Sequence, residues 1–239
     1  MTNSAQEIIE RADALYAARS EQQSVRLSVD ALDHALAREF NYELAWRLSR
    51  ALFFLGQEAQ DTNAARGFHA RAVESCERAA RAEPSRVEGH FWLGVNLALL
   101  AAHEKPLSAL RRAHRARRHL RQAVALNPGY HAAGPLRVLA RLEAKLPNIF
   151  GGGHARAHAN FERAIAIAPA NTVTRLYFAE MLLDAGDQQH ARQQLRALLD
   201  APLDPAWKFE TERDRRLAQA MLQNMSHVET PKSNVKTGS

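Results

Sequence analysis

Arginines and histidines crowd one short run of the chain, from Arg111 to Arg121, where six arginines and two histidines fall within eleven residues. Such a run can neutralise phosphates or the carboxylates of an acidic protein. It contains no aromatic residue that could stack on a base, and its apolar residues recur at helical spacing. We interpret it first as the solvated face of a helix, second as a site for an acidic partner helix, and last as a nucleic-acid site.

A glycine-rich turn with the sequence LPNIFGGGH spans residues 146–154. Glycines that open a helix expose backbone N–H groups, which can hold an anion. No Gly-Lys-Ser/Thr sequence follows, so the turn is not the phosphate-binding P-loop of nucleoside triphosphatases. We expect a tight turn that folds Phe150 into the core, and we keep Phe150, Gly151 and Gly152 as candidates for contact with a ligand or partner.

A third group of candidates lies on two apolar segments. His90, Trp92 and Asn96 belong to the sequence HFWLGVN, and Arg137 and Arg141 are one helical turn apart. A buried asparagine needs a hydrogen-bond partner, and a tryptophan dominates either packing or an interface. We expect a core helix with one satisfied polar residue. The functional hypothesis is that these five residues line a partner-binding groove.

Signatures of catalysis and of metal binding are weak or missing in the sequence. His154 and His158 are four residues apart, but no third ligand accompanies them. There is no G-x-S-x-G sequence, and the single cysteine, Cys76, lies on a helical pattern as a small core residue. We therefore predict no enzyme, no catalytic residue, no metal site and no cofactor.

Composition favours helices throughout. Glycine (11) and proline (9) are scarce in 239 residues, and aromatic residues make up only 7%, which leaves little material for a sheet. The net charge of +6 favours acidic partners. No run of eighteen apolar residues occurs, so we expect no membrane span. Without a signal peptide or lipobox, the sequence as written predicts a cytoplasmic protein, or a periplasmic one if a leader was removed.

A recurring helix ending reveals an internal repeat. An apolar residue recurs at spacing i, i+4 and i+7 and a proline follows at i+12, in Ala72-Cys76-Ala79-Pro84, Ala116-Leu120-Ala123-Pro128 and Ala157-Phe161-Ala164-Pro169. The three apolar positions share one helix face, and the proline stops the helix. The last unit, residues 172–205, has 34 residues and carries the tetratricopeptide pattern, with a turn at Gly186-Asp187.

These repeats predict an all-α fold, a tetratricopeptide-type solenoid of helix hairpins in a right-handed superhelix. We expect one domain over residues 1–227, built from five hairpins and a closing helix, and a disordered tail over 228–239. Asn41, Ser85 and Asn171 are predicted helix N-caps. The predicted helices cover residues 4–19, 23–39, 41–58, 63–82, 86–103, 108–126, 130–146, 152–168, 171–185, 188–199 and 205–225.

Several segments together resemble a known family. They are AWRLSRALFFLGQ (45–57), RVEGHFWLGVNLALLA (86–101), NPGYHAAGPLRVLARLEAKLP (127–147) and IFGGGHARAHANFERAIAIAP (149–169). With the last repeat, they resemble the T-component proteins of TRAP transporters, which are tetratricopeptide-like and similar to the eukaryotic regulators of microtubule dynamics. The resemblance implies a non-enzymatic helical scaffold that oligomerises and docks a solute-binding protein around an apolar channel.

Two functions follow as hypotheses. The first is a non-catalytic scaffold that binds a peptide or protein partner in the concave groove lined by the first helices of the hairpins. The alternative is a small-ligand or lipid-like binding module, associated with a TRAP-type transporter, with an apolar channel of roughly 300 Å³ or more.

Overall fold

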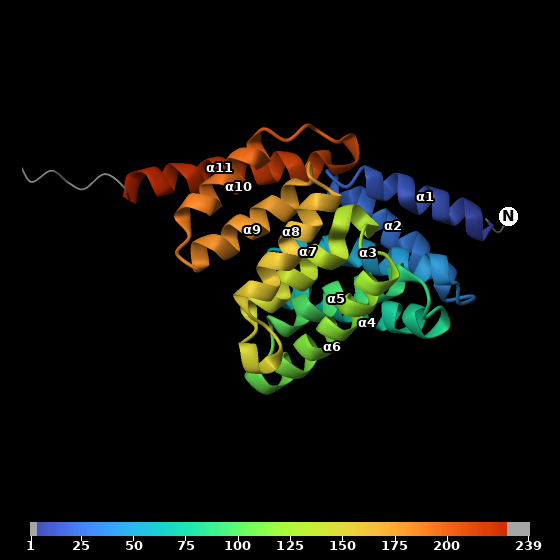
Figure 1. Ribbon diagram of the computed structural model, residues 1–239. Helices are drawn as coiled ribbons and strands as arrows, with labels where there is room; N and C mark the ends of the chain where they lie inside the picture. Colours follow the sequence, from blue (N-terminus) through green and yellow to red (C-terminus); the bar gives the residue numbers. More distant parts are fainter. Residues whose placement is uncertain (1–3, 229–239) are drawn as a thin grey trace, which may run out of the picture. The chain divides into compact units, whose positions relative to one another are not determined.

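The computed structural model describes residues 4–228, and the secondary structure in that range is entirely helical (Figure 1). The chain divides into two compact units, residues 1–168 and 169–239. Unit 1 contains α1 (Ala5–Ala17), α2 (Gln22–Leu36), α3 (Tyr42–Glu58), α4 (Thr62–Ala82), α5 (Val87–Ala101), α6 (Pro106–Leu126), α7 (Tyr130–Lys145), the 3-10 turn η1 (Asn148–Phe150) and α8 (His154–Ile167). Unit 2 contains α9 (Thr172–Asp184), α10 (Gln188–Leu199), the 3-10 turn η2 (Pro205–Trp207) and α11 (Lys208–Val228).

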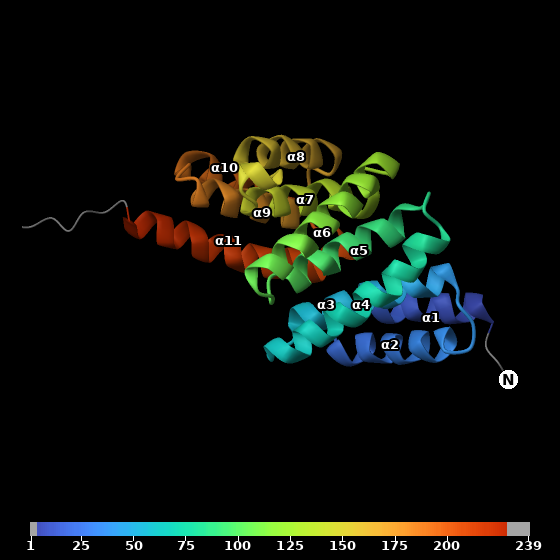
Figure 2. The same ribbon diagram turned by 90° about the horizontal axis from the view of Figure 1, so that it is seen from below.

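Unit 1 is a series of four helix hairpins, as the repeat predicts. Each odd-numbered helix packs against the helix that follows it, and Figure 2 shows α1 with α2 and α3 with α4 as neighbouring pairs. The first helices of successive hairpins also contact one another, α1 with α3, α3 with α5, and α5 with α7. A stack of this kind buries apolar stripes that a single hairpin would leave exposed to solvent.

The repeat positions identified in the sequence lie in the core. All nine apolar residues of the three helix endings are fully buried: Ala72, Cys76, Ala79, Ala116, Leu120, Ala123, Ala157, Phe161 and Ala164. Burial raises the pKa of the Cys76 thiol to about 12. The prediction that Cys76 is a core residue is therefore confirmed.

Helix α5 occupies the centre of unit 1, with α3, α4, α6 and α7 packed around it. Phe91, Trp92, Leu93 and Leu97 are all almost completely buried and anchor the largest hydrophobic cluster. Gly94 permits the close approach of α6, because a Cβ atom there would lie 2.7 Å from Cγ of Leu120. Dense packing of this kind makes α5 sensitive to any change in side-chain volume.

The start of α7 departs from the predicted helix over residues 130–146. His131, Ala132 and Ala133 have positive φ angles of 52°, 52° and 58°, so regular right-handed helix begins only near Pro135. Proline favours the first turn of a helix, where its missing N–H costs nothing. The buried Arg137 side chain donates to the carbonyl oxygens of Ala132 at 2.8 Å and His131 at 3.4 Å, and thereby holds the left-handed turn.

Unit 2 consists of one hairpin and a closing helix, since α11 packs against both α9 and α10. Gly186 has a φ of +81°, and the Asp187 side chain accepts a hydrogen bond from the N–H of His190, so the predicted turn and cap are confirmed. At the other end of the hairpin, the buried Thr172 hydroxyl donates to the Asp214 carboxylate of α11 at 2.8 Å.

Most predicted helix limits agree with the structure to within three residues. Asn41 and Asn171 cap α3 and α9 as predicted, whereas the prediction for Ser85 is wrong because Arg86 occupies the N-cap position of α5. Helix α11 extends to Val228, and the rest of the predicted tail lies outside the described residues. Among residues 4–228, no helix combines the length and apolarity needed to cross a bilayer.

Two helical glycines provide a matched test of the packing. A Cβ atom at Gly67 of α4 would meet nothing within 4 Å, whereas one at Gly56 of α3 would lie 2.5 Å from Cε1 of the buried His69 ring. We expect Gly67→Ala to raise the free energy of unfolding by roughly 0.5–1 kcal/mol, because alanine has the higher helix propensity. Gly56→Ala should lower it by about 1–3 kcal/mol through overpacking. Urea denaturation measures both, and stabilisation by Gly56→Ala would contradict the described packing.

Candidate protein-binding site

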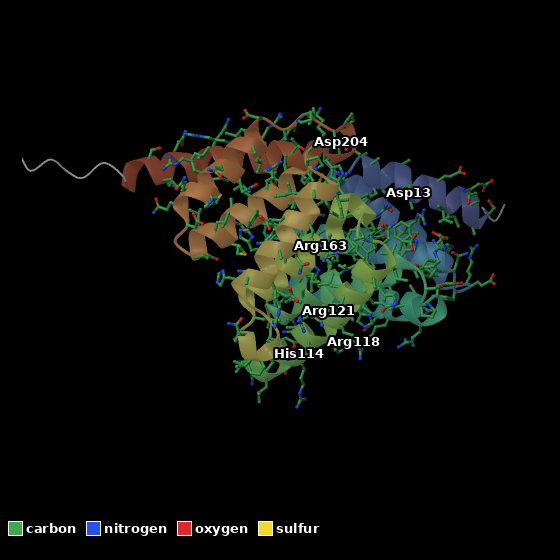
Figure 3. All side chains as sticks on the ribbon, viewed as in Figure 1. Asp13, His114, Arg118, Arg121, Arg163 and Asp204 are labelled. Atoms are coloured by element: carbon green, nitrogen blue, oxygen red, sulfur yellow. The ribbon has the colours of Figure 1, made fainter. Side chains whose placement is uncertain are left out.

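One charged network joins the first helices of successive hairpins in unit 1. On α1, Asp13 accepts hydrogen bonds from two arginines of α3, with Nε of Arg47 at 3.1 and 3.0 Å and Nη2 of Arg50 at 2.6 Å. Nη1 of Arg47 also donates to Oε2 of Glu43, one turn earlier, at 2.6 Å. Asp13 is labelled on α1 in Figure 3. The network therefore connects α1 to α3.

The same network continues from α3 to the start of α5. Oε1 of Glu43 accepts from Nη1 of Arg86 at 2.5 Å, and Nη2 of Arg86 donates to Glu88 at 3.1 Å. The Tyr42 hydroxyl donates to Glu88 at 3.0 Å and accepts from the N–H of Gly89 at 3.2 Å. Positive and negative groups thus alternate across three helices.

Aromatic rings fix the guanidinium groups of this network from a second side. A guanidinium over the face of an aromatic ring is attracted by the electron density of that face. The guanidinium carbon lies 4.1 Å from the ring centroid for Arg47 on Trp46, 4.0 Å for Arg50 on Tyr16 and 4.2 Å for Arg86 on Tyr42. Each cation is therefore held by a carboxylate and a ring together, which limits its freedom before any partner arrives.

The network remains charged at neutral pH. Burial raises the pKa of Asp13, but the hydrogen bonds from Arg47 and Arg50 outweigh it and bring the pKa below its ordinary value. Burial likewise raises the pKa of Glu43, and the hydrogen bonds from Trp46, Arg86 and Arg47 again reverse the shift. Groups that stay charged recognise other charges, whereas proton transfer needs a pKa close to the working pH.

The outer members of the network are accessible. The side chains of Asp13 and Arg86 are each 39% exposed and that of Glu43 is 32% exposed, whereas Arg47 and Arg50 are mostly covered. The surface formed by Asp13, Glu43 and Arg86 therefore offers acceptors and donors from α1, α3 and the start of α5. We call this surface the first-helix surface. Its chemistry suits recognition of a charged or polar chain.

Asn96, one of the residues predicted from the sequence, is the centre of a buried polar triad. Its amide nitrogen donates to the Ser49 hydroxyl at 3.2 Å and to the Trp92 carbonyl at 2.9 Å, and its Oδ1 lies 2.9 Å from Nδ1 of His69. Burial lowers the pKa of His69, which keeps its ring neutral. Because Asn96 is fully buried and paired, it confirms the expectation of a satisfied polar residue and leaves no side-chain surface for a partner.

Trp92 and His90 are also interior residues. Trp92 is 1% exposed, and its indole N–H donates to the Tyr130 hydroxyl at 3.2 Å. The His90 ring is stacked on His119 of α6, with Nδ1 atoms 3.0 Å apart, and its Nε2 lies 3.0 Å from the Pro84 carbonyl oxygen. These side chains join α5 to its neighbours and are not presented to a partner.

Arg137 is buried and holds the left-handed turn, so the structure gives it a structural role. Arg141, one turn later on α7, is half-buried. The structure therefore does not bring the five predicted groove residues together on one accessible face. The first-helix surface consists instead of residues that the sequence did not single out as a site.

Backbone hydrogen bonds within the glycine turn and to α7 close this segment. The N–H of Gly153 donates to the Glu143 carbonyl at 2.8 Å, and the N–H of Gly152 donates to the Pro147 carbonyl at 3.2 Å, so neither donor is open to an anion. A Cβ atom at Gly152 would lie 1.9 Å from the Leu146 carbonyl oxygen. Phe150 is half-buried with its ring edge-on to His114 at 6.1 Å. The expected tight turn is confirmed, but the expectation that it folds Phe150 into the core is wrong, because the ring packs on the exposed His114 instead.

The first-helix network was missed because its members are distant in the sequence. Only the pair Glu43 and Arg47, four residues apart on a helix, gave a local signal. The partners on α1 and α5 become neighbours only when the hairpins stack. Among the described residues, no group of three or more histidine, cysteine or acidic side chains could hold a metal ion.

The network should contribute stability that is lost in acid. Carboxyl groups whose pKa falls on folding stabilise the protein above their unfolded pKa, near 4, and this stabilisation disappears as the pH falls through the folded pKa. We expect Asp13→Asn with Glu43→Gln to lower the free energy of unfolding at pH 6 by about 1 kcal/mol, after allowance for solvent screening. At pH 3 the difference from the wild type should be smaller than at pH 6. Urea denaturation at both pH values measures it, and a constant difference would contradict the network.

The stacked histidine pair predicts a second pH effect. Burial lowers the pKa of His119 to about 4, and the charges of His90, Arg118 and Arg115 add to the shift. Because the unfolded ring binds a proton near pH 6.5 and the folded ring does not, stability falls as the pH drops from 6.5 towards 4. After allowance for solvent screening of the half-buried ring, we expect a loss of about 1–2 kcal/mol in the wild type and a smaller loss in His119→Gln. Urea denaturation at pH 6.5 and pH 4.5 measures both proteins. Equal losses in the wild type and in His119→Gln would contradict the assignment of this effect to His119.

The part of the chain that contains the first-helix surface matches a known family. The family described as regulator of microtubule dynamics protein 1-3 matches residues 8–134, just over half of the chain. Regulator of microtubule dynamics protein 3 of Xenopus laevis is 23% identical over 209 residues. That alignment covers 82% of this chain but only 45% of the relative, so the chain spans about half of the relative's length.

Solved structures support the fold. TTC0263, a thermophilic TPR protein of Thermus thermophilus, superposes with a TM-score of 0.66 at 20% identity, over 88% of this chain and 98% of that one. MamA superposes with a TM-score of 0.51 at 16% identity, over 83% of this chain and 94% of that one. At these identities the likeness concerns the fold alone. With the family match, it leads to one conclusion: the chain is a tetratricopeptide-type helical protein that belongs to the regulator of microtubule dynamics protein 1-3 family.

Proposed function

We propose that the chain is a non-catalytic interaction scaffold that binds an extended peptide segment of a protein partner across the first-helix surface. The single observation that carries the proposal is the charged and aromatic network that crosses α1, α3 and the start of α5. Stacked helix hairpins are widely used as extended binding surfaces of this kind.

The chemistry of the surface fits a peptide. Glu43 and Asp13 accept hydrogen bonds, and Arg86 donates them, so the surface can pair with side chains of either sign and with backbone groups. Because salt bridges and ring contacts already hold these side chains, a partner would order few of them on binding. Binding energy is lost when side chains must be immobilised, so preordered groups favour affinity.

The fold-level comparisons support a protein partner in general terms. The name of the Xenopus relative states a role in microtubule dynamics, and binding of a microtubule component would be one case of the proposed activity. Because the chain matches less than half of that relative, the role is not carried over to this chain.

The alternative function, a ligand module of a TRAP-type transporter, finds less support. It requires an apolar channel, whereas a hollow of about 480 Å³ on α10 and one of about 360 Å³ on α6 are both lined by polar and charged side chains. The matched family and the relatives named above include no transporter component. The resemblance to T-component proteins, the docking of a solute-binding protein, oligomerisation and the compartment therefore stay predictions.

Selection from a random library of displayed twelve-residue peptides tests the proposal. Peptides enriched on the wild-type chain should bind at least about tenfold more weakly to the double variant Glu43→Gln with Arg86→Ala, because recognition draws on both charges. Arg66→Ala, which changes an exposed residue of α4, is the matched control and should leave binding unchanged. Circular dichroism checks that each variant is folded.

Two outcomes would count against the first-helix surface. One is a library that yields no enriched peptide. The other is a set of enriched peptides that binds the double variant and the wild type equally well by fluorescence anisotropy.

A further inference from the structure

Helix α6 has two kinds of arginine, although the sequence shows one uninterrupted basic run. Its apolar face, with Ala113, Ala116, Leu120 and Ala123, is buried in unit 1. Three arginines next to this face each meet a carboxylate: Arg112 with Glu104 at 2.5 Å, Arg117 with Glu143 at 2.9 Å, and Arg115 with Glu77. These three arginines therefore have a structural role, because each forms an ion pair that fixes α6 in unit 1.

Two of the carboxylates that hold them make a second contact. Glu143 is 2% exposed and also accepts a hydrogen bond from Asn160 of α8 at 3.0 Å. Glu77 meets Arg81 as well as Arg115. Glu143 and Glu77 therefore cannot turn to a further cation without breaking a contact that the fold already makes.

The other three arginines, Arg111, Arg118 and Arg121, are exposed and meet no acidic side chain within the part of the chain that the structure describes. With His114 they follow one another at intervals of three and four residues, so they form a single stripe along α6. Figure 3 labels His114, Arg118 and Arg121 along this helix. We call these four residues the α6 stripe. At 1.5 Å per residue it is about 15 Å long.

The stripe has a shaped surface as well as charge. His114, Arg118 and Arg121 line a shallow hollow of about 360 Å³ together with Arg117 and Gln122. The Phe150 ring lies edge-on to His114, one of the residues that line this hollow. A Cβ atom at Gly151 would lie 2.6 Å from Nη1 of Arg117, so the glycine turn makes room for this guanidinium beside the hollow.

We propose that the α6 stripe binds a short acidic peptide segment of a protein partner. Uncompensated like charges along one helix face repel one another, and an anion between them relieves that repulsion. An extended segment of about five residues spans 15 Å, so four to six clustered aspartates or glutamates match the stripe. Arginine suits this task because its guanidinium can bind a carboxylate through two parallel hydrogen bonds.

The surroundings favour a short acidic peptide over a nucleic acid. Glu77 and Glu104 pair with Arg115 and Arg112, so these two arginines offer no free cation to a longer polyanion. Binding of a duplex backbone draws on many more phosphate contacts than three arginines supply. The stripe lies on a second helix of a hairpin and uses no residue of the first-helix surface, so the two proposals can fail separately.

Fluorescence anisotropy with a labelled eight-residue glutamate-rich peptide tests the proposal at 50 mM and 150 mM salt. Arg118→Gln with Arg121→Gln should weaken binding at least about tenfold, and binding of the wild type should weaken as salt rises. The matched control is Arg26→Gln with Arg66→Gln, two exposed arginines of α2 and α4. This control lowers the net charge of +6 by the same two charges and should change the affinity less than twofold.

Three results would overturn the proposal. The first is the absence of measurable binding of the acidic peptide at 50 mM salt. The second is an equal loss of affinity in both double variants, which would show attraction to net charge alone. The third is a twelve-nucleotide single strand that binds more tightly than the peptide and loses affinity in the stripe variant, which would make the stripe a nucleic-acid site.

Discussion

Unit 1 is organised around the burial of α5 between the helices on either side of it. Phe91, Trp92 and Leu97 fill the space between hairpins, and the Asn96 triad fixes the register of α3, α4 and α5 by hydrogen bonds that have no competing water. Apolar burial supplies the driving force, whereas the buried polar groups restrict the helices to one alignment. Both proposed binding surfaces include residues on helices that pack against α5.

Charge is distributed on this stack in two different ways. On the first helices, carboxylates and guanidiniums neutralise one another across α1, α3 and α5, so the surface is ordered and has little net charge. On α6, the inner arginines are neutralised by neighbouring helices and the outer ones are not. Arginine content alone therefore does not identify a binding surface. For the α6 stripe, what matters is which guanidiniums the fold leaves without a carboxylate.

The sequence predicted the helices and their buried faces well, because both depend on local spacing. The positions of Ala79, Ala123 and Phe161 follow from the i, i+4, i+7 pattern, and all are in the core. The ion pairs between helices could not be predicted from the sequence. Asp13 and Arg47 are 34 residues apart, and Arg117 and Glu143 are 26 apart, so no local pattern links them. Trp92 and Asn96 were open to two interpretations, because a large or polar side chain on an apolar helix suits either a core or a groove.

The left-handed turn before α7 was missed for a related reason. Pro135 marks the place where regular helix can begin, but three successive residues with positive φ are unfavourable in isolation. They persist because the buried Arg137 binds two of their carbonyl groups. A residue that the sequence presented as a binding candidate thus stabilises the backbone.

The central claim is that unit 1 is one rigid stack whose binding surfaces exist before a partner arrives. Native-state hydrogen exchange followed by mass spectrometry tests it most directly, because it resolves the opening of each helix. We expect the amides of α5 to exchange last and those of α3, α4 and α6 to be protected nearly as well. Exchange of α5 as early as that of α1 and α2 would contradict it.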